Sequence, residues 1–221
     1  MKIVFSVGGS LVCPDEIDNG YIEKLSKFIN KLAKKHRIYA VVGGGKTARK
    51  YVASLREFKA NEFFCDMLGI EITRINACLL ISALNLSYMP YRKIVDASES
   101  AERIVIMGGI HPMHTTDGVA AMLAENVSAD YFINLTNIDY VYDKDPNKFR
   151  DAKKLETVSY DELISISNQA EMKAGANNVL DLLAAKNIKR SSMKTFIING
   201  KKLENVEKAI EGKKFIGTLV K

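Results

Sequence analysis

Short runs of apolar residues alternate along the chain with longer stretches of helical periodicity. A continuous apolar run predicts a strand that is covered on both faces of a sheet. Such runs occur in five places: KIVFSV (2–7), RIYAVV (37–42), RIVIM (103–107), YFINLT (131–136) and KTFIING (194–200). The pattern therefore indicates an α/β protein with a largely buried central sheet.

Amphipathic stretches lie between these runs and predict helices. They cover YIEKLSKFINKLAKK (21–35), a segment from about Thr47, the segment from about Asp66 to Leu84, GVAAMLAE (118–125) and VLDLLAAK (179–186). Strands separated by helices pair in parallel through right-handed crossovers. We therefore expect one domain, residues 1–221, folded as a three-layer α/β/α sandwich with a mainly parallel central sheet. The polar segment 139–160 is expected to form a loop or a hairpin over the sheet edge.

Composition changes this picture little. The 221 residues are 47% hydrophobic and 26% charged, which suits a globular protein with a full-sized core. The net charge of +6 comes largely from helix-like stretches, so we interpret it as a solvated basic surface rather than a nucleic-acid interface. Three scattered cysteines favour reduced thiols, and no stretch approaches the roughly 20 apolar residues of a membrane span. These features predict a cytoplasmic protein without a nucleic-acid or membrane partner.

Three of the predicted strands end in glycine-rich elbows. Their sequences are VGGSL, VVGGGKTARK and MGGIHPMHTTD. In a parallel sheet the carboxyl ends of the strands meet at one edge, where ligands bind. Glycine lets the backbone approach a ligand, and the first amides of the following helix favour an anion. Although a single elbow is weak evidence, the three together predict a phosphate site, and none has the spacing of a P-loop or of the dinucleotide fingerprint.

The second elbow adds positive charge to this site. Lys46 lies at the glycine turn and Arg49 lies one helical turn further on. Both side chains can reach phosphate oxygens, Lys46 as a point charge and Arg49 as a fork. Lys50 is interpreted as a solvated helix residue.

The third elbow admits three interpretations: a metal site, a nucleophile with its base, and a cradle for an anion. His111 and His114 are three residues apart, but His36 is the only other histidine, and no Cys pair or H-E-x-x-H run is present. The G-x-S-x-G run of an activated serine is also absent. An anion is suited by the hydroxyls of Thr115 and Thr116, the amides beyond them, and His114 as a side chain that can carry positive charge. We therefore expect an anion cradle without a protein-held metal, with Asp117 as the helix cap.

Four motifs stand in the same order as in a known family: VGGSL, VVGGGKTARK, GGIHPMHTTDGVAAMLAE and LTNIDYVYDKDP. On these motifs the chain resembles the amino acid kinase family, and within it most closely the UMP kinases of the archaeal type. The resemblance implies transfer of a phosphoryl group from ATP to UMP, giving UDP and ADP in pyrimidine nucleotide biosynthesis, with Mg²⁺ accompanying ATP. It also implies a homohexamer built as a trimer of dimers.

The resemblance assigns roles to individual residues, the acceptor side coming from the N-terminal part of the chain and the ATP side from the C-terminal part. It implies that Lys46, Arg49, Asp117 and Asp181 surround the reacting phosphates. The residues implied for ATP are Gly9, Ser10, Gly45, Arg49, Thr136, Tyr142 and Asp145. The residues implied for UMP are Gly44, Asp66, His114, Thr115, Thr116, Asp117, Gly118, Val119 and Ala120, with Asp66 holding the ribose hydroxyls.

Two positions depart from the family pattern. A lysine that neutralises the transferred phosphoryl group in many members is Ser6 here, so Lys46 or Arg49 is expected to compensate. The turn that usually reads Asp-Gly-Val-Tyr carries Tyr140 in place of glycine, and a tyrosine adopts positive φ only at a cost, so a different turn is expected.

Other functions stay open at this point. Another small-molecule kinase of the family, acting on isopentenyl phosphate or carbamate, is the alternative enzyme, although Asp66 favours a nucleotide. The Ser6 departure keeps a nucleotide-sensing domain without turnover in consideration, and a basic nucleic-acid binder ranks third. The helix predicted from Asp66 to Leu84 is apolar on more than one side, which predicts burial or contact with a partner copy near this helix.

Overall fold

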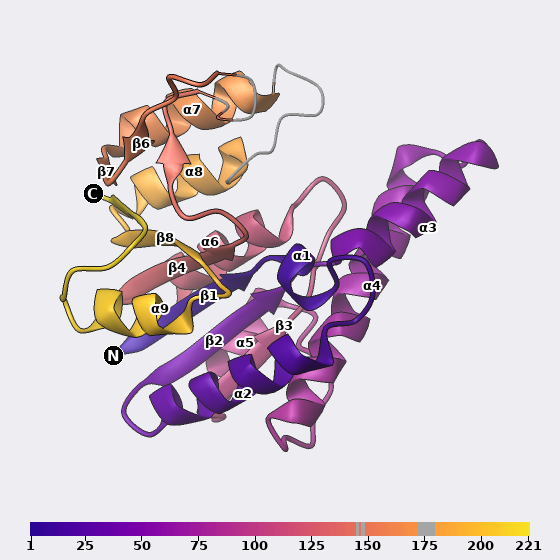
Figure 1. Ribbon diagram of the computed structural model, residues 1–221. Coiled ribbons are helices and arrows are strands. Elements are labelled where there is room, and N and C mark those ends of the chain that lie inside the picture. The colour runs from indigo at the N-terminus through magenta and orange to yellow at the C-terminus, as the bar shows by residue number, and fades with distance from the viewer. Residues whose placement is uncertain (145, 147–148, 172–179) are drawn as a thin grey trace.

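The computed structural model describes residues 1–144, 146, 149–171 and 180–221 of the chain. Its central sheet has seven strands in the order β3-β2-β1-β4-β8-β9-β7 (Figure 1). All neighbouring strands in it are parallel except β8 and β9. The strands of this sheet are β1 (Lys2–Val7), β2 (Arg37–Val42), β3 (Ile104–Met107), β4 (Tyr131–Thr136), β7 (Thr157–Val158), β8 (Thr195–Asn199) and β9 (Thr218–Val220).

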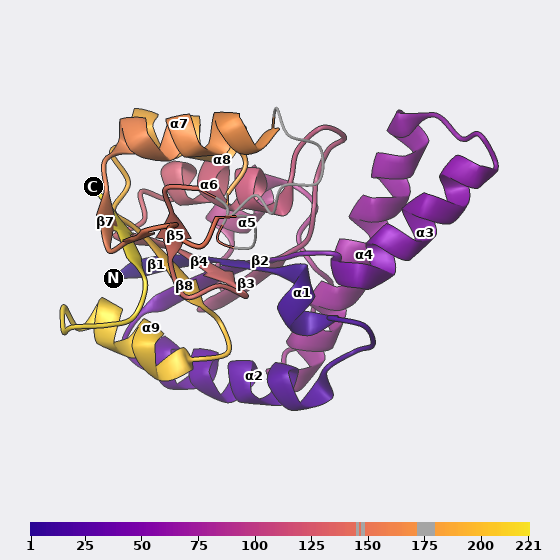
Figure 2. The same ribbon diagram turned by 45° about the horizontal axis from the view of Figure 1, so that its top comes forward.

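Helices cover both faces of the sheet (Figure 2). The helices that pack on one face are α1 (Gly9–Val12), α2 (Asn19–Ala33), the C-terminal half of α4 (Glu62–Ala83) and α9 (Leu203–Ile210). The helices that pack on the other face are α5 (Ile94–Glu99), α6 (Thr116–Asn126), α7 (Tyr160–Glu171) and α8 (Leu182–Arg190). The remaining helix, α3 (Gly45–Glu57), projects from the body of the molecule beside the first half of α4 (Figures 1 and 2).

The alternation of side chains along β1 explains the two cores. Ile3, Phe5 and Val7 point into the core that contains α2, whereas Val4 points into the core that contains α6. Successive side chains of a strand face opposite sides, so a strand with helices on both sides must be apolar throughout. The exception is Ser6, which is fully buried on the α6 side. The predicted three-layer sandwich with a mainly parallel sheet is confirmed.

The described residues of the polar segment 139–160 include a pair of antiparallel strands, so the hairpin expected there is present. Strands β5 (Val141–Tyr142) and β6 (Lys154–Leu155) pair antiparallel beside the main sheet. The sequence did not predict α1, α5, α7, α9, β7 or β9, most of which are too short for a clear periodicity. Within the described residues, no helix is long and apolar enough to cross a membrane.

Candidate active site

The glycine elbows after β1 and β2 touch each other at the carboxyl edge of the sheet. A side chain on Gly9 would collide with the backbone of Gly45, and a Cβ on Gly43 would lie 2.6 Å from the Gly9 nitrogen. Gly45 has φ of +65°, a conformation that favours glycine. The same Cβ on Gly43 would lie 3.4 Å from Oγ1 of Thr116, so the third elbow meets the other two. The structure therefore brings all three predicted elbows into one site.

Helix α4 fixes two of these elbows through buried polar side chains. The Nδ2 amide of Asn76 donates to the carbonyl of Gly43 at 2.9 Å and to that of Gly44 at 3.2 Å. One turn earlier, Oγ1 of Thr73 accepts a hydrogen bond of 2.6 Å from the Gly109 amide. Sequence reasoning missed both residues, and the signal was two uncharged polar residues three positions apart on the buried side of the helix, which is otherwise apolar.

The threonine elbow begins α6 and also reaches α8. The Thr115 hydroxyl accepts a hydrogen bond of 3.0 Å from the Gly118 amide, which makes Thr115 the N-cap of α6. The same hydroxyl donates to the Asp181 carboxylate, and Asp181 caps α8 by accepting from the Ala184 amide at 2.9 Å. The prediction that Asp117 caps the helix is wrong, because Asp117 lies in the first turn and the side chain at the cap position is that of Thr115.

Asp117 instead pairs with Ser6, the residue that stands where many family members have lysine. The Ser6 hydroxyl donates to Oδ1 of Asp117. The pKa of Asp117 is raised to about 6, mainly by burial and further by the charge of Asp181, while the Ser6 hydrogen bond acts in the opposite direction. This carboxyl therefore lies in a low-dielectric pocket beside a second carboxylate, with a hydroxyl rather than an ammonium as its partner.

Asp66 faces the loop between β3 and α6. Its Oδ2 accepts a hydrogen bond of 2.9 Å from the backbone amide of Met113. Asp66 lies one turn inside α4 and not at its start, since the helix begins at Glu62 with Asn61 as its cap. The Asn61 side chain, which accepts from the Phe64 amide, accounts for the earlier start.

The two histidines of the loop contact each other. The rings of His111 and His114 are edge to face with centroids 5.8 Å apart, and each Nδ1 lies near the carbonyl oxygen of Pro112, at 3.0 and 3.2 Å. Among the residues that the structure describes, no group of three or more His, Cys, Asp or Glu side chains is arranged to hold a metal ion.

The two predicted cations differ in their surroundings. The ammonium of Lys46 pairs with the carboxylate of Asp15, and this contact lowers the pKa of Asp15. Arg49 lies exposed on α3 and makes no ion pair or hydrogen bond with any described residue. Arg49 is therefore the cation that a ligand can recruit without breaking an existing contact.

The far side of the edge is formed by the end of β4 and the hairpin that follows it. The Thr136 carbonyl accepts a hydrogen bond of 2.8 Å from the Gly200 amide, and Tyr142 lies in β5. Asp139 pairs with Lys202 at 2.7 Å and accepts from Asn199 at 2.9 Å. The Lys202 contact lowers the pKa of Asp139. The sequence did not single out Lys202 or Asn199.

Tyr140 occupies the turn where the family pattern has glycine. It is not among the described residues with positive φ, so the turn forms in another conformation, as expected. Its ring lies 4.9 Å from the Lys154 ammonium. The predicted ATP-side residue Asp145 lies outside the described residues.

The model of the amino acid kinase family matches residues 1–199 of the chain. The chain belongs to the amino acid kinase family. Similar relatives include a uridylate kinase from Thermococcus sibiricus, 46% identical over 100% of this chain and 99% of the relative. Another, from Pyrococcus abyssi, is 47% identical over 96% of each chain.

Solved structures have the same architecture. Uridylate kinase from Archaeoglobus fulgidus superposes with a TM-score of 0.89 at 43% identity and covers 100% of both chains. UMP kinase from Ureaplasma parvum superposes with a TM-score of 0.79 over 100% of this chain and 98% of its own, but at 23% identity it supports the fold alone.

Proposed function

We propose that this protein is a UMP kinase, which transfers the terminal phosphoryl group of ATP to UMP and produces UDP and ADP for pyrimidine nucleotide biosynthesis. The observation that carries the proposal is the meeting of three glycine elbows at the start of α6, in a chain 46% identical over its full length to a uridylate kinase. Phosphoryl transfer requires mainly positioning of the reactants and neutralisation of charge. Backbone amides, hydroxyls and cations at one edge of the sheet meet both requirements.

The acceptor side is proposed to lie between α4 and α6. The helix start directs amides toward the UMP phosphate, and Thr116 adds a hydroxyl there. The UMP-binding residues proposed on this side are Gly44, Asp66, His114, Thr115, Thr116, Asp117, Gly118, Val119 and Ala120. Asp66 is proposed to hold the ribose hydroxyls, because its carboxylate faces the same loop from the opposite side.

The ATP side is proposed to lie over the ends of β1, β2 and β4, within the same domain. Gly9, Ser10 and Gly45 supply backbone and hydroxyl donors, and Arg49 supplies the charge that the absent lysine would carry. Lys46 pairs with Asp15 and contributes after exchanging that partner for phosphate. Thr136, Tyr142 and Asp145 are proposed for the adenosine end of ATP.

Mg²⁺ is proposed to accompany ATP. This ion commonly binds through one or two carboxylates together with phosphate oxygens and water, rather than in an all-protein cage. Asp181 fits such a role, because it is partly exposed at the start of α8 beside the threonine elbow. The ion would neutralise charge on the transferring phosphates, while Thr115 and the α8 amides hold the Asp181 carboxylate in place.

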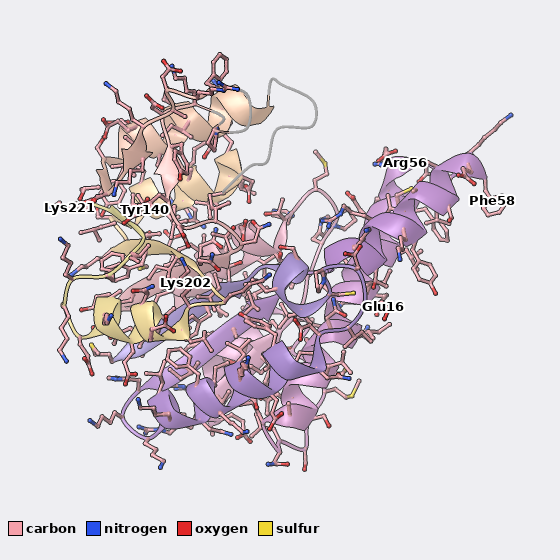
Figure 3. All side chains as sticks on the ribbon, viewed as in Figure 1. Glu16, Arg56, Phe58, Tyr140, Lys202 and Lys221 are labelled. Atoms are coloured by element: carbon pink, nitrogen blue, oxygen red, sulfur yellow. The ribbon has the colours of Figure 1, made fainter. Side chains whose placement is uncertain are left out.

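A homohexamer assembled from dimers is proposed as the working form. The projecting α3–α4 pair carries exposed apolar side chains, and Figure 3 shows Phe58 at its far end. Phe58 is 82% exposed, Phe63 63% and Phe64 56%. Exposed apolar side chains gathered on a projecting element mark an interaction surface. Sedimentation of the wild-type chain beside a Phe63→Glu/Phe64→Glu variant tests this, since the proposal requires a smaller species in the variant and a wild type that is not a monomer.

All three cysteines are free thiols, which supports a reducing compartment such as the cytoplasm.

The activity is tested by incubating the chain with ATP and Mg²⁺ and one acceptor at a time. The acceptors are UMP, CMP, AMP, GMP, isopentenyl phosphate and carbamate, and the readout is ADP release. Preference for UMP supports the proposal. Preference for one of the last two identifies another kinase of the family, and nucleotide binding without turnover with any acceptor indicates a sensor.

A further inference from the structure

The loop between β3 and α6 contains a residue in an unfavourable backbone conformation. Met113 has φ of +66° although it carries a side chain, and that side chain is 90% exposed. Left-handed backbone at a residue other than glycine persists when its surroundings supply a compensating contact. The methionine side chain supplies none, since it extends into solvent. The compensation must come from the backbone.

The backbone contact is the hydrogen bond from the Met113 amide to Oδ2 of Asp66, at 2.9 Å. Further hydrogen bonds fix the loop on both sides of Met113. On one side Thr73 accepts from the Gly109 amide, and on the other the His114 amide donates to the His111 carbonyl at 3.3 Å. The left-handed turn at Met113 therefore directs one amide at one carboxylate oxygen.

Asp66 is held from its own side as well. It stands on α4 seven residues before Thr73, almost two full turns, so both side chains lie on one stripe of the helix. That stripe faces the loop, because both residues accept hydrogen bonds from it. Within the described part of the chain, Oδ1 of Asp66 has no hydrogen-bond partner. The carboxylate is thus anchored at one oxygen and available at the other.

We propose that the Met113 amide is a positioning group for Asp66, and that the left-handed backbone at Met113 sets how strongly the site prefers ribose over deoxyribose. The inference rests on the proposed UMP kinase function. A carboxylate anchored at Oδ2 presents Oδ1 to a sugar hydroxyl in a fixed plane. Without the anchor the carboxylate rotates, and part of the selectivity for the hydroxyl is lost.

The test compares Met113→Val with Met113→Gly. Valine is β-branched and disfavours positive φ, whereas glycine accepts it and keeps the N–H. We expect Met113→Val to raise KM for UMP about tenfold and KM for ATP less than twofold, because a β-branched side chain adds to the cost of left-handed backbone that methionine already bears. Its preference for UMP over deoxy-UMP falls about fivefold, from the loss of a charge-assisted hydrogen bond. Met113→Gly keeps a clearly lower KM for UMP than the valine variant.

Ser128→Val is the matched control. Ser128 also has positive φ, at +49°, but it follows the C-terminal end of α6, away from the elbows. The same backbone cost there affects stability and leaves the UMP preference unchanged. In an Asp66→Asn background, Met113→Val is expected to cause no further loss of preference, because the group it positions is already altered.

Three results overturn the inference: an unchanged UMP preference in Met113→Val, a loss equally large in Ser128→Val, or a full effect of Met113→Val that persists with Asp66→Asn. A wild-type chain that releases no ADP with UMP overturns the proposed function and the inference with it. If the wild type is active with UMP and Met113→Val has the same preference for UMP over deoxy-UMP, only the inference is overturned.

Discussion

The acceptor side and the ATP side of the site differ in the contacts that hold them. On the acceptor side, Thr73 and Asn76 are buried side chains that bond directly to the backbone of the elbows. On the ATP side, the turn after β4 has hydrogen bonds as well, such as the one from Asn199 to Asp139, but it also has an ion pair of Asp139 with Lys202, whose side chains are 37% and 39% exposed. Both sides thus have buried hydrogen bonds, and the ATP side has in addition a charge contact that water reaches.

The difference predicts different responses of the two sides to mutation and salt. A buried hydrogen bond is insensitive to ionic strength, and removing one partner leaves an unsatisfied group at a cost of about 1–3 kcal/mol. A partly exposed ion pair contributes less than about 1 kcal/mol and is screened by salt. We therefore expect KM for UMP to change little with salt concentration and KM for ATP to change more.

The largest expected effect is that of Arg49→Ala. If Arg49 carries the charge that the family lysine supplies elsewhere, kcat falls by about 10²–10³-fold, the usual range for loss of a group that stabilises transition-state charge. The fold is retained, because Arg49 is exposed and makes no hydrogen bond or ion pair with other described residues. Lys50→Ala, the neighbouring exposed cation, is the control. Unchanged turnover in Arg49→Ala, measured by ADP release, removes Arg49 from the mechanism.

Lys202→Met is expected to have a smaller effect, confined to the ATP side. Loss of the ion pair frees Asp139 and raises KM for ATP about threefold at low salt, while KM for UMP stays the same. At 0.5 M salt the variant and wild type converge, because the pair is screened. Lys201→Met removes the neighbouring lysine, which has no such pair among described residues, and serves as the control. An equal change in both KM values would contradict the comparison.

The smallest expected effects are on stability, and they have opposite signs on the two sides. Burial raises the pKa of Asp117 to about 6, so its charged form destabilises the fold above that pH. Lys202 lowers the pKa of Asp139, so its charged form stabilises the fold. At pH 7.5, Asp117→Asn is expected to raise Tm by about 2–4 °C, which corresponds to about 1 kcal/mol in the free energy of unfolding. Asp139→Asn is expected to lower Tm by a smaller amount.

The pH dependence follows from the same shifts. The difference in Tm between Asp117→Asn and the wild type is full above about pH 6. It disappears below the unfolded-state pKa of 3.8, where Asp117 is protonated in both the folded and the unfolded wild type. The Asp139→Asn difference is present above 3.8 and is lost as the pH falls through the lowered folded-state pKa. Thermal unfolding at pH 7.5, 5 and 3.5 checks both, and differences of equal sign at pH 7.5 would contradict the assignment.

The sequence predicted the five long strands and the three elbows, because burial on both faces and strand-to-helix turns leave local patterns. It did not predict the pairs that organise the site. Ser6 and Asp117 are 111 residues apart, and Thr115 and Asp181 are 66 apart, so only the packed fold brings each pair together. The sequence predicts Asp117 as the cap because aspartate is a common cap at a helix start, but the cap position is decided by where the chain enters α6, which is at Thr115.

The central claim is that the threonine elbow holds the phosphate of UMP. The most direct test is KM for UMP and for ATP in Thr116→Val, with Thr157→Val on the exposed edge strand β7 as the matched control. We expect KM for UMP to rise about 10–100-fold and KM for ATP to change less than twofold, since a hydrogen bond to a charged group contributes about 1.5–3 kcal/mol. An unchanged KM for UMP would contradict the claim. So would stoichiometric zinc in the purified protein that is lost together with activity in His114→Ala.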